Sequence, residues 1–223
     1  MKNKLIVKIL AVVCGVSGLM ILAWVFLPII SYEFTAPPLV SYLSPIPDTR
    51  AVVDDTKASN WFVGTRPSDF KTDKVTFYNI SIPRLRIKDA VVSIGGEDLS
   101  DSLIQYPGTA LPGKSGNAII FGHSILPQFF SPTDYLSIFS NLPDLQKGDE
   151  IDIHYDGIFY KYMVEEKFEI LPTDIQVLEQ NLSDSFLTLV TCVPPGDPRR
   201  PRRLIIRARI APITREAHTT NFL

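Results

Sequence analysis

The chain has 223 residues, of which 45% are hydrophobic and 21% are charged. This composition supports a folded core and excludes disorder from end to end. The net charge of −2 at pH 7 shows no basic excess, so the sequence does not indicate a nucleic-acid-binding protein.

A continuous apolar run occupies residues 9–30 and contains no charged side chain. A helix of this length spans roughly 33 Å, about the hydrocarbon core of a bilayer. Lys2, Lys4 and Lys8 precede the run, and the first basic residue after it is Arg50. The positive-inside rule therefore predicts a single-pass protein of the cell membrane, with a cytoplasmic N-terminus and an extracellular remainder.

A cleaved signal peptide is the alternative for this apolar segment. The apolar core of a signal peptide has about 7–15 residues and ends at a small-residue cleavage site. The run here is longer and ends in the bulky sequence FLPII, so a retained anchor is favoured. Trp24 and Tyr32 are then expected near the outer membrane interface.

Residues 31–74 are predicted to form a linker and lead-in to the main domain. The prolines of this stretch are Pro37, Pro38, Pro45, Pro47 and Pro67. Because proline restricts its own backbone and that of the preceding residue, we expect an extended, semi-rigid spacer that holds the domain off the membrane. The part around Trp61 and Phe62 is expected to pack on the domain.

The rest of the chain is predicted to be mostly β-strand, because β-branched and aromatic residues cluster in short runs between turn residues. The expected strands cover residues 76–82, 85–87, 90–94, 117–122, 151–155, 158–164, 186–192 and 204–210. Asp156 and Gly157 predict a hairpin turn between two of these strands. Short helical pieces are expected at residues 134–140 and 174–180. This pattern indicates an all-β sandwich or a closed barrel.

Cys192 is the first candidate for a reactive side chain. It ends an apolar strand, and the sequence VPPG that follows stops the strand at the rim of a sheet. The only other cysteine, Cys14, lies in the membrane run, so the two cannot pair within one chain. An unpaired thiol outside the cell indicates either a reactive nucleophile or a buried cysteine that acts as a small hydrophobic residue.

His123 is the second candidate, and it follows an apolar strand directly after Gly122. The chain has 3 histidines. His154 is out of phase with the apolar residues of its strand and is expected to face outward, and His218 lies in the C-terminal tail. By elimination His123 is the best candidate for a base beside Cys192, and a surface loop histidine is the alternative.

Arg203 opens the last expected strand, a short loop after Cys192. A hairpin across this loop returns an arginine toward the cysteine, but spacing alone does not distinguish Arg203 from Arg202. A solvated basic loop is the other interpretation, because Arg199 and Arg200 lie in the same cluster. A thiol, an imidazole and a guanidinium together suit nucleophilic catalysis, since the cations stabilise the thiolate and a developing oxyanion.

The segments that carry these three residues resemble those of the sortase family. TLVTC at residues 188–192 resembles the sortase cysteine motif, NAIIFGHS at 117–124 the histidine segment, and RLIIR at 203–207 the strand of the essential arginine. The segment IPRLRI at 82–87 resembles the opening strand. Order and spacing agree over about residues 76–211.

The resemblance implies a closed sortase-type β-barrel of about eight strands with short helices, and a cysteine transpeptidase. Such enzymes cleave a sorting signal like Leu-Pro-x-Thr-Gly after the threonine, hold a thioacyl-enzyme and pass the acyl group to an amine. Cys192 would be the nucleophile, His123 the general acid and base, and Arg203 the group that orients substrate and stabilises the oxyanion. Thr191 and Leu189 of the cysteine motif would contact the substrate.

The implied partners are surface proteins with a sorting signal, an amine acceptor (a cell-wall precursor or a pilin lysine) and the membrane, with no nucleic acid. No cofactor is expected; some relatives use calcium, but the sequence identifies no site. A membrane-anchored cysteine hydrolase and an inactive sortase-like binding module are the alternative functions. The implied organisation is a cytoplasmic N-terminus at 1–8, an anchor at 9–30, a linker at 31–74, a catalytic domain at 75–212 and a tail at 213–223.

Two segments depart from the family pattern. The loop ILPQFF at residues 125–130 is bulky and apolar and lies beside the candidate histidine. The sequence Arg84-Leu85-Arg86 carries an arginine where sortases often have a glycine. Neither departure affects the three candidate catalytic positions.

Overall fold

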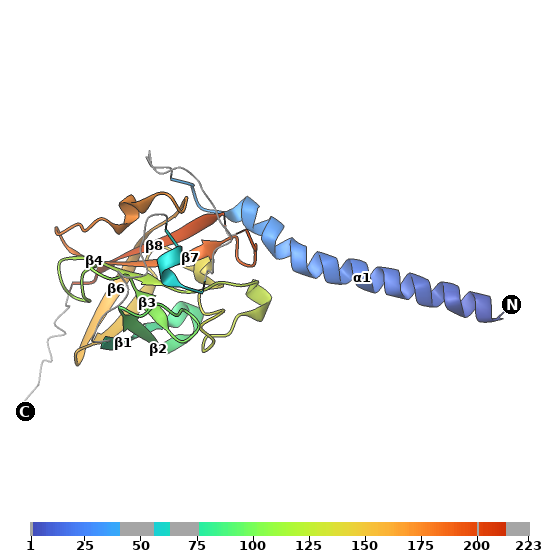
Figure 1. Ribbon diagram of the computed structural model, residues 1–223, viewed down its shortest axis with the longest axis horizontal. Helices are drawn as coiled ribbons and strands as arrows, with labels where there is room; N and C mark the ends of the chain where they lie inside the picture. Colours follow the sequence, from blue (N-terminus) through green and yellow to red (C-terminus); the bar gives the residue numbers. More distant parts are fainter. Residues whose placement is uncertain (1, 41–55, 63–75, 200, 213–223) are drawn as a thin grey trace, which may run out of the picture.

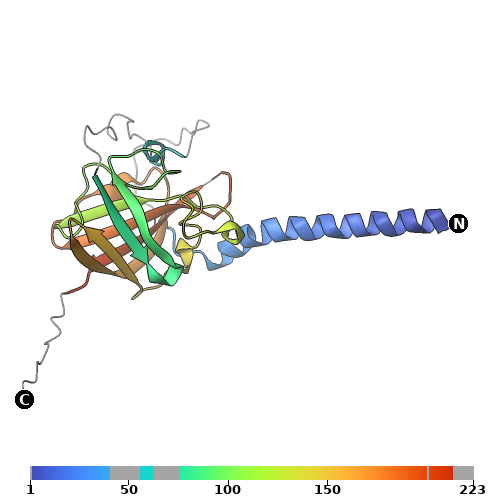
Figure 2. The same ribbon diagram turned by 90° about the horizontal axis from the view of Figure 1, so that it is seen from below.

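A closed β-barrel stands at one end of a long N-terminal helix (Figures 1 and 2). The computed structural model describes residues 2–40, 56–62, 76–199 and 201–212. Most of the expected linker, and the C-terminal tail with His218, lie outside the described residues.

Helix α1 (Lys2–Thr35) contains the whole apolar run, including Pro28, and continues past it to Thr35. Its segment Ile6–Thr35 is long and apolar enough to cross a membrane. Most of its large apolar side chains are exposed, as suits a helix surrounded by lipid. Tyr32, by contrast, is buried against the barrel.

The strands follow the order β1-β2-β3-β4-β7-β8-β6-β5 around the barrel. They are β1 (Thr76–Ile82), β2 (Ile87–Ile94), β3 (Leu103–Gln105), β4 (Gly116–Phe121), β5 (Glu150–Tyr155), β6 (Ile158–Ile170), β7 (Ser185–Val193) and β8 (Arg202–Ile210). The β2–β3 and β4–β7 neighbours are parallel, and the other neighbours are antiparallel. The prediction of a closed barrel of eight strands is confirmed.

The predicted hairpin joins β5 to β6. Asp156 has φ +51° and Gly157 has φ +75°, the left-handed pair that a two-residue type I′ turn requires. Tyr155 and Ile158 face each other on either side of this turn. His154 is exposed on β5, as its alternation predicted, and its ring stacks on Phe159.

Four local expectations differ from the structure. The strand β3 was not expected, because its three residues are all buried and show no alternation. Of the strand expected at residues 85–87, Leu85 instead ends the 3-10 helix η3 (Pro83–Leu85), which has proline at its start, and Arg86 is a turn residue. Residues 174–180 contain only the 3-10 helix η6 (Ile175–Leu178).

The fourth difference is at residues 134–140, which form consecutive turns instead of a helix, ahead of η5 (Leu142–Asp144). Serine hydroxyls there bond to backbone groups elsewhere: Ser137 Oγ accepts from Ser131 N and Ser140 Oγ accepts from Ile125 N. Such bonds compete with the helical pattern.

Alternate strand residues belong to two apolar clusters. The larger cluster fills the barrel interior and includes residues from all eight strands, among them Leu189 and Leu204. The second cluster includes Val190 and Ile205, their neighbours in sequence, so it lies on the opposite, outer face of β7 and β8. Trp61, from the lead-in segment, belongs to this outer cluster and is fully buried. The prediction that the lead-in packs on the domain at Trp61 is confirmed.

The chain that leaves α1 runs along the barrel wall rather than away from it. Leu39 forms a parallel bridge with Glu169 of β6. Glu169 N donates to Pro38 O at 2.9 Å, and Val40 N donates to Glu169 O at 2.7 Å. The backbone is extended, as the prolines predicted, but this part of it does not act as a spacer.

Candidate active site

The parallel pairing of β4 with β7 brings the candidate histidine and cysteine to the same rim of the barrel. Phe121, the last residue of β4, pairs with Val190. His123 and Cys192 each lie two residues further along in the same direction, so they are neighbours in register. Both side chains are buried.

Two hydroxyl groups hold this register beyond the end of β4. Ser124 Oγ donates to Cys192 O at 2.6 Å, and Thr191 Oγ1 donates to Gly122 O at 2.8 Å. Gly122 N also donates to Val190 O at 3.2 Å. The backbone around the histidine is therefore tied to the backbone around the cysteine at three points.

Strand β8 adds the arginine from the other side of β7. Cys192 pairs directly with Arg203 in the antiparallel ladder. Residues that face each other in this way have Cβ atoms about 5 Å apart and side chains on one face of the sheet. The face is the outer one, because Val190 and Ile205 belong to the outer cluster. The structure thus brings the three candidate residues together.

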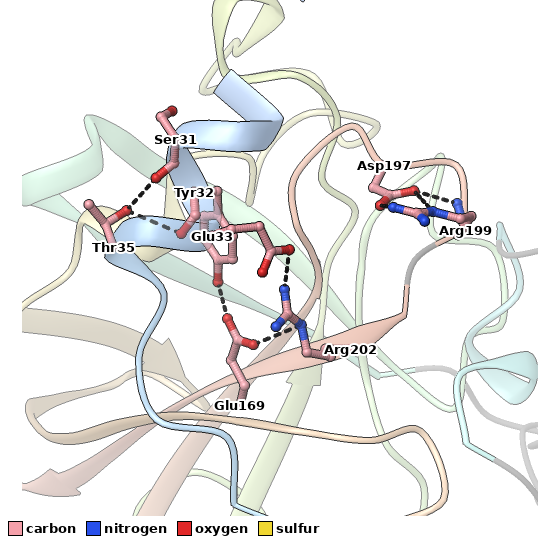
Figure 3. Close-up of polar contacts among 8 residues, drawn as sticks. All are labelled: Ser31, Tyr32, Glu33, Thr35, Glu169, Asp197, Arg199 and Arg202. Atoms are coloured by element: carbon pink, nitrogen blue, oxygen red, sulfur yellow. Dashed lines mark hydrogen bonds and ion pairs between the residues drawn. The ribbon is translucent and has the colours of Figure 1, made fainter. Parts of the chain in front are cut away.

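Successive side chains of β8 point to opposite faces of the sheet, so the structure distinguishes Arg203 from Arg202. Spacing in the sequence did not distinguish them. Arg203 is buried beside Cys192, whereas Arg202 points toward the end of α1 (Figure 3). Arg199 forms an ion pair with Asp197 at 2.6 Å in the same loop, and this hydrogen-bonded partner lowers the pKa of the Asp197 carboxyl. The arginines of the basic cluster therefore have different partners: Arg203 lies beside Cys192, Arg202 contacts the end of α1, and Arg199 pairs within its own loop.

Trp61 covers the site. Its ring lies 5.8 Å from the ring of His123 and 5.4 Å from the guanidinium carbon of Arg203. Arg203 Nε also donates to Trp61 O at 3.3 Å. The sequence predicted that Trp61 packs on the domain but not that it sits on the candidate catalytic residues; a large aromatic residue in a proline-rich lead-in was the available signal.

The covering segment, residues 56–62, is attached to the loop before β3. Ala58 N donates to Glu97 O and Leu99 N donates to Thr56 O, each at 3.0 Å. Ser59 Oγ donates to Glu97 Oε1 at 2.6 Å. These contacts hold the segment closed over a cysteine that is only 2% exposed.

A cavity of about 260 Å³ remains beside the cysteine. Cys192, Ser124 and Asp197 contribute to its wall, together with Leu126 and Phe129 of the loop at 125–130. The bulky loop noted in the sequence thus forms one side of the space next to the thiol.

Leu189 and Thr191 lie on the opposite face of β7 from Cys192 and point toward the barrel interior. Leu189 is fully buried in the interior cluster, and Thr191 is fully buried with its hydroxyl bonded to Gly122. In this structure both residues support the strand and have no surface open to a substrate. A substrate bound on the outer face of the rim would therefore not contact them.

The end of α1 is joined to the barrel by four side chains, which we call the polar junction: Tyr32, Glu33, Glu169 and Arg202 (Figure 3). Tyr32 Oη donates to Glu169 Oε1 at 2.5 Å. Arg202 is paired with Glu169 at 3.0 Å and with Glu33 at 2.6 Å. Burial is the main cause that raises the pKa of the Glu169 carboxyl, against the opposing effects of Tyr32 and Arg202.

Within the described residues no group of three or more His, Cys, Asp or Glu side chains could hold a metal ion.

The fold and the rim together define a class, a closed β-barrel protein with a cysteine, a histidine and an arginine gathered at one rim. The sequence profile of the sortase domain matches residues 80–211. The chain belongs to the sortase family, whose members are cysteine transpeptidases.

Solved structures with a similar fold are sortases. A sortase D5 transpeptidase from Clostridium perfringens is 30% identical, with a TM-score of 0.52, over 61% of this chain and 79% of that one. A lid mutant of sortase A from Corynebacterium diphtheriae is 28% identical, with a TM-score of 0.54, over 65% and 75%. Sortase C-1 from Actinomyces oris is 26% identical, with a TM-score of 0.53, over 61% and 73%. Comparison with curated protein sequences gave no match.

Proposed function

We propose that this sortase is a membrane-anchored transpeptidase that cleaves a sorting signal of the Leu-Pro-x-Thr-Gly type after its threonine. One observation supports the proposal most: the ladder pairing that sets Cys192 between His123 and Arg203 on one face of the rim. The positive-inside rule supports a catalytic domain outside the cell, with the N-terminus in the cytoplasm.

In the first half of the reaction the Cys192 thiolate attacks the threonine carbonyl carbon and forms a carbon–sulfur bond. The Arg203 guanidinium stabilises the negative oxygen of the tetrahedral intermediate. The carbon–nitrogen bond then breaks, and the His123 imidazolium gives its proton to the departing amine. A thioacyl-enzyme and a neutral imidazole remain.

In the second half an amine attacks the thioester carbon. His123 takes a proton from the attacking nitrogen as the new amide bond forms, and the Cys192 thiolate leaves. The acceptor amine belongs to a cell-wall precursor or to a pilin lysine. The reaction exchanges one amide for another and needs no oxidant or metal.

Substrate entry requires that the covering segment at residues 56–62 moves. Trp61 is fully buried and contacts both His123 and Arg203, so a peptide cannot lie on these groups while it is in place. Displacement would free the Arg203 guanidinium from the Trp61 carbonyl for use by the substrate. We propose that the sorting signal binds only after this exchange.

The test is incubation of the full chain in detergent micelles with a Leu-Pro-x-Thr-Gly peptide and an amine. The proposal expects a transfer product and a thioacyl-enzyme detected by intact mass, both absent in Cys192→Ala. Transfer that persists in this variant would rule out the assigned nucleophile.

The same assay separates the two alternative functions. If the released product is the free carboxylic acid whether or not an amine is present, water is the acceptor and the enzyme is a hydrolase. A folded wild-type chain that forms no thioacyl-enzyme, and whose Cys192 ignores an alkylating reagent even with peptide present, indicates an inactive binding module.

A further inference from the structure

A groove of about 1000 Å³ lies between α1 and the barrel. Its helix wall is made by Trp24, Leu27, Pro28, Ser31, Tyr32 and Thr35. Each of these residues has another of the set three or four positions away, so they form one continuous face of α1. The groove therefore follows the helix axis over several turns.

The chemistry of this face changes along the helix. Trp24, Leu27 and Pro28 are apolar, whereas Ser31, Tyr32 and Thr35 carry hydroxyl groups. If the hydrocarbon core begins after Lys8, about 20 residues of helix cross it, which places its outer boundary near Pro28. The groove thus passes from the depth of acyl chains to the depth of lipid headgroups.

The barrel wall of the groove is cationic. Arg84, Arg86 and Lys167 line it, and Asp144 is the one acidic residue of the lining. Lys167 Nζ donates to two backbone oxygens, at 2.7 and 2.9 Å, rather than to a carboxylate. Arg84 and Arg86 are exposed, and neither forms an ion pair with another described residue. This excess of positive charge is local, because the whole chain is acidic.

Arg86 occupies a backbone position that favours glycine. Its φ is +58°, in the left-handed region, at the end of η3. The turn itself needs only the backbone here, since Arg86 N donates to Pro83 O at 3.0 Å. A long cationic side chain kept at a strained position beside a groove points to a use for the side chain.

The loop at residues 125–130 closes the apolar end of the groove, next to Trp24. Pro127 and Phe130 belong to its lining. Gln128 Nε2 donates to Trp24 O at 3.3 Å, and the Phe129 ring meets the Trp24 ring edge-on at 5.5 Å. The apolar part of the groove is thus enclosed by aromatic and proline side chains from both elements.

We propose that this groove binds an anionic phospholipid of the outer leaflet, with its phosphate between Arg84 and Arg86 and an acyl chain along Trp24 and Leu27. A soluble anion would use only the cationic end, whereas a lipid matches both the charge and the apolar wall. The proposal rests on α1 as a membrane anchor and not on the transpeptidase reaction.

The test is native mass spectrometry of the full chain released from micelles that contain equal amounts of phosphatidylglycerol and phosphatidylcholine. Wild type is expected to retain one phosphatidylglycerol in preference to phosphatidylcholine. Each arginine near an anionic headgroup contributes a factor of about fivefold, so Arg84→Gln with Arg86→Gln should lower the preference about 25-fold. Lys88→Gln removes an exposed cation that does not line the groove and should leave the preference unchanged.

Arg86→Gly separates binding from folding. Glycine adopts φ +58° without strain, so this variant should be at least as stable as wild type and still lose about fivefold in lipid preference. A stable Arg86→Gly chain with the wild-type preference would contradict the proposal, as would a double variant that retains it.

Further arms identify the source of the anion and keep the two proposals apart. Excess inorganic phosphate should not displace the lipid; displacement would indicate a site for free anions and overturn the lipid assignment. Transfer to a water-soluble peptide is measured on the same samples and should be unaffected in the double variant. A wild-type chain that shows lipid preference but no transfer would refute the proposed function alone. A wild-type chain that shows transfer but no lipid preference would refute the lipid site alone.

Discussion

Arg203 donates a hydrogen bond to the backbone oxygen of Trp61, and its guanidinium lies 5.4 Å from the indole ring of the same residue. The arginine proposed to stabilise the oxyanion is thus held by the residue that closes the site. In the proposed function, closure of the site and stabilisation of the oxyanion therefore compete for one side chain.

Trp61→Ala should make Cys192 react faster with iodoacetamide in the absence of peptide. Loss of a large buried side chain destabilises the closed state by up to several kcal/mol. A destabilisation of about 1.4 kcal/mol is enough to raise the population of the open state tenfold. We expect at least a tenfold increase in rate, measured by intact mass in a Cys14→Ser background, because Cys14 is also a free thiol.

A matched control for this variant is Phe77→Ala, which removes a largely exposed aromatic residue of β1. It should leave the alkylation rate unchanged. Equal rates in wild type and Trp61→Ala would show that the covering segment does not limit access to the thiol.

Arg203→Gln should lower kcat for peptide transfer about 100- to 1000-fold, the usual loss when one oxyanion donor is removed. Arg203→Lys keeps the charge but not the forked geometry, so it should recover only part of the rate. Arg209→Gln, at the far end of β8 and paired with Glu165, is the control and should retain wild-type kcat. Normal turnover in Arg203→Gln would remove Arg203 from the mechanism.

The polar junction should make stability depend on pH through Glu169. A carboxyl whose pKa is raised by burial keeps its proton to higher pH in the folded chain than in the unfolded chain, where its ordinary value is 4.5. The free energy of unfolding therefore falls as pH rises from about 4.5 through the folded-state pKa. Thermal unfolding in micelles at a series of pH values should show this fall, and Glu169→Gln should flatten it.

Tyr32→Phe tests the same carboxyl in the opposite direction. The Tyr32 hydroxyl lowers the pKa of Glu169 by a hydrogen bond, so its removal raises the pKa further and should extend the fall to higher pH. Identical pH profiles for wild type, Glu169→Gln and Tyr32→Phe would mean that Glu169 does not control this dependence.

Gly122→Ala should destabilise the barrel next to the histidine. A Cβ at this position would lie 2.4 Å from Phe139 Cδ2 and 2.5 Å from Leu103 Cδ2. Overpacking of this kind costs about 1–3 kcal/mol, which chemical denaturation would detect. Adding Phe139→Leu replaces the rigid ring by a smaller, flexible side chain and should restore part of the loss; a neutral Gly122→Ala would show that the neighbours move freely.

Features that depend on local sequence were predictable. The run of β-branched and aromatic residues at Thr76–Ile82 is a strand with the expected bounds. Asp156 and Gly157 form the expected turn, because their preference for left-handed backbone acts within the turn itself. The place of Cys192 at the end of its strand followed from the prolines after it.

Features that depend on contacts between distant segments were not predictable from one sequence. Tyr32 and Glu169 are separated by 137 positions, and nothing near either residue indicates the other. The position of Trp61 over Arg203 and the short strand β3 likewise arise only when the barrel closes. The helix expected at residues 134–140 failed because serine hydroxyls there bond to backbone that is distant in sequence, such as Ile125 N.

The buried contact between Tyr32 and Glu169 fixes the position of the barrel relative to the last turn of α1. In the proposed function, the reacting edge is therefore confined to a narrow band of height above the lipid surface. A surface protein that is still held by its own membrane segment must deliver its scissile bond into this band. The number of residues between that segment and the sorting signal would then decide which surface proteins can reach the site as substrates.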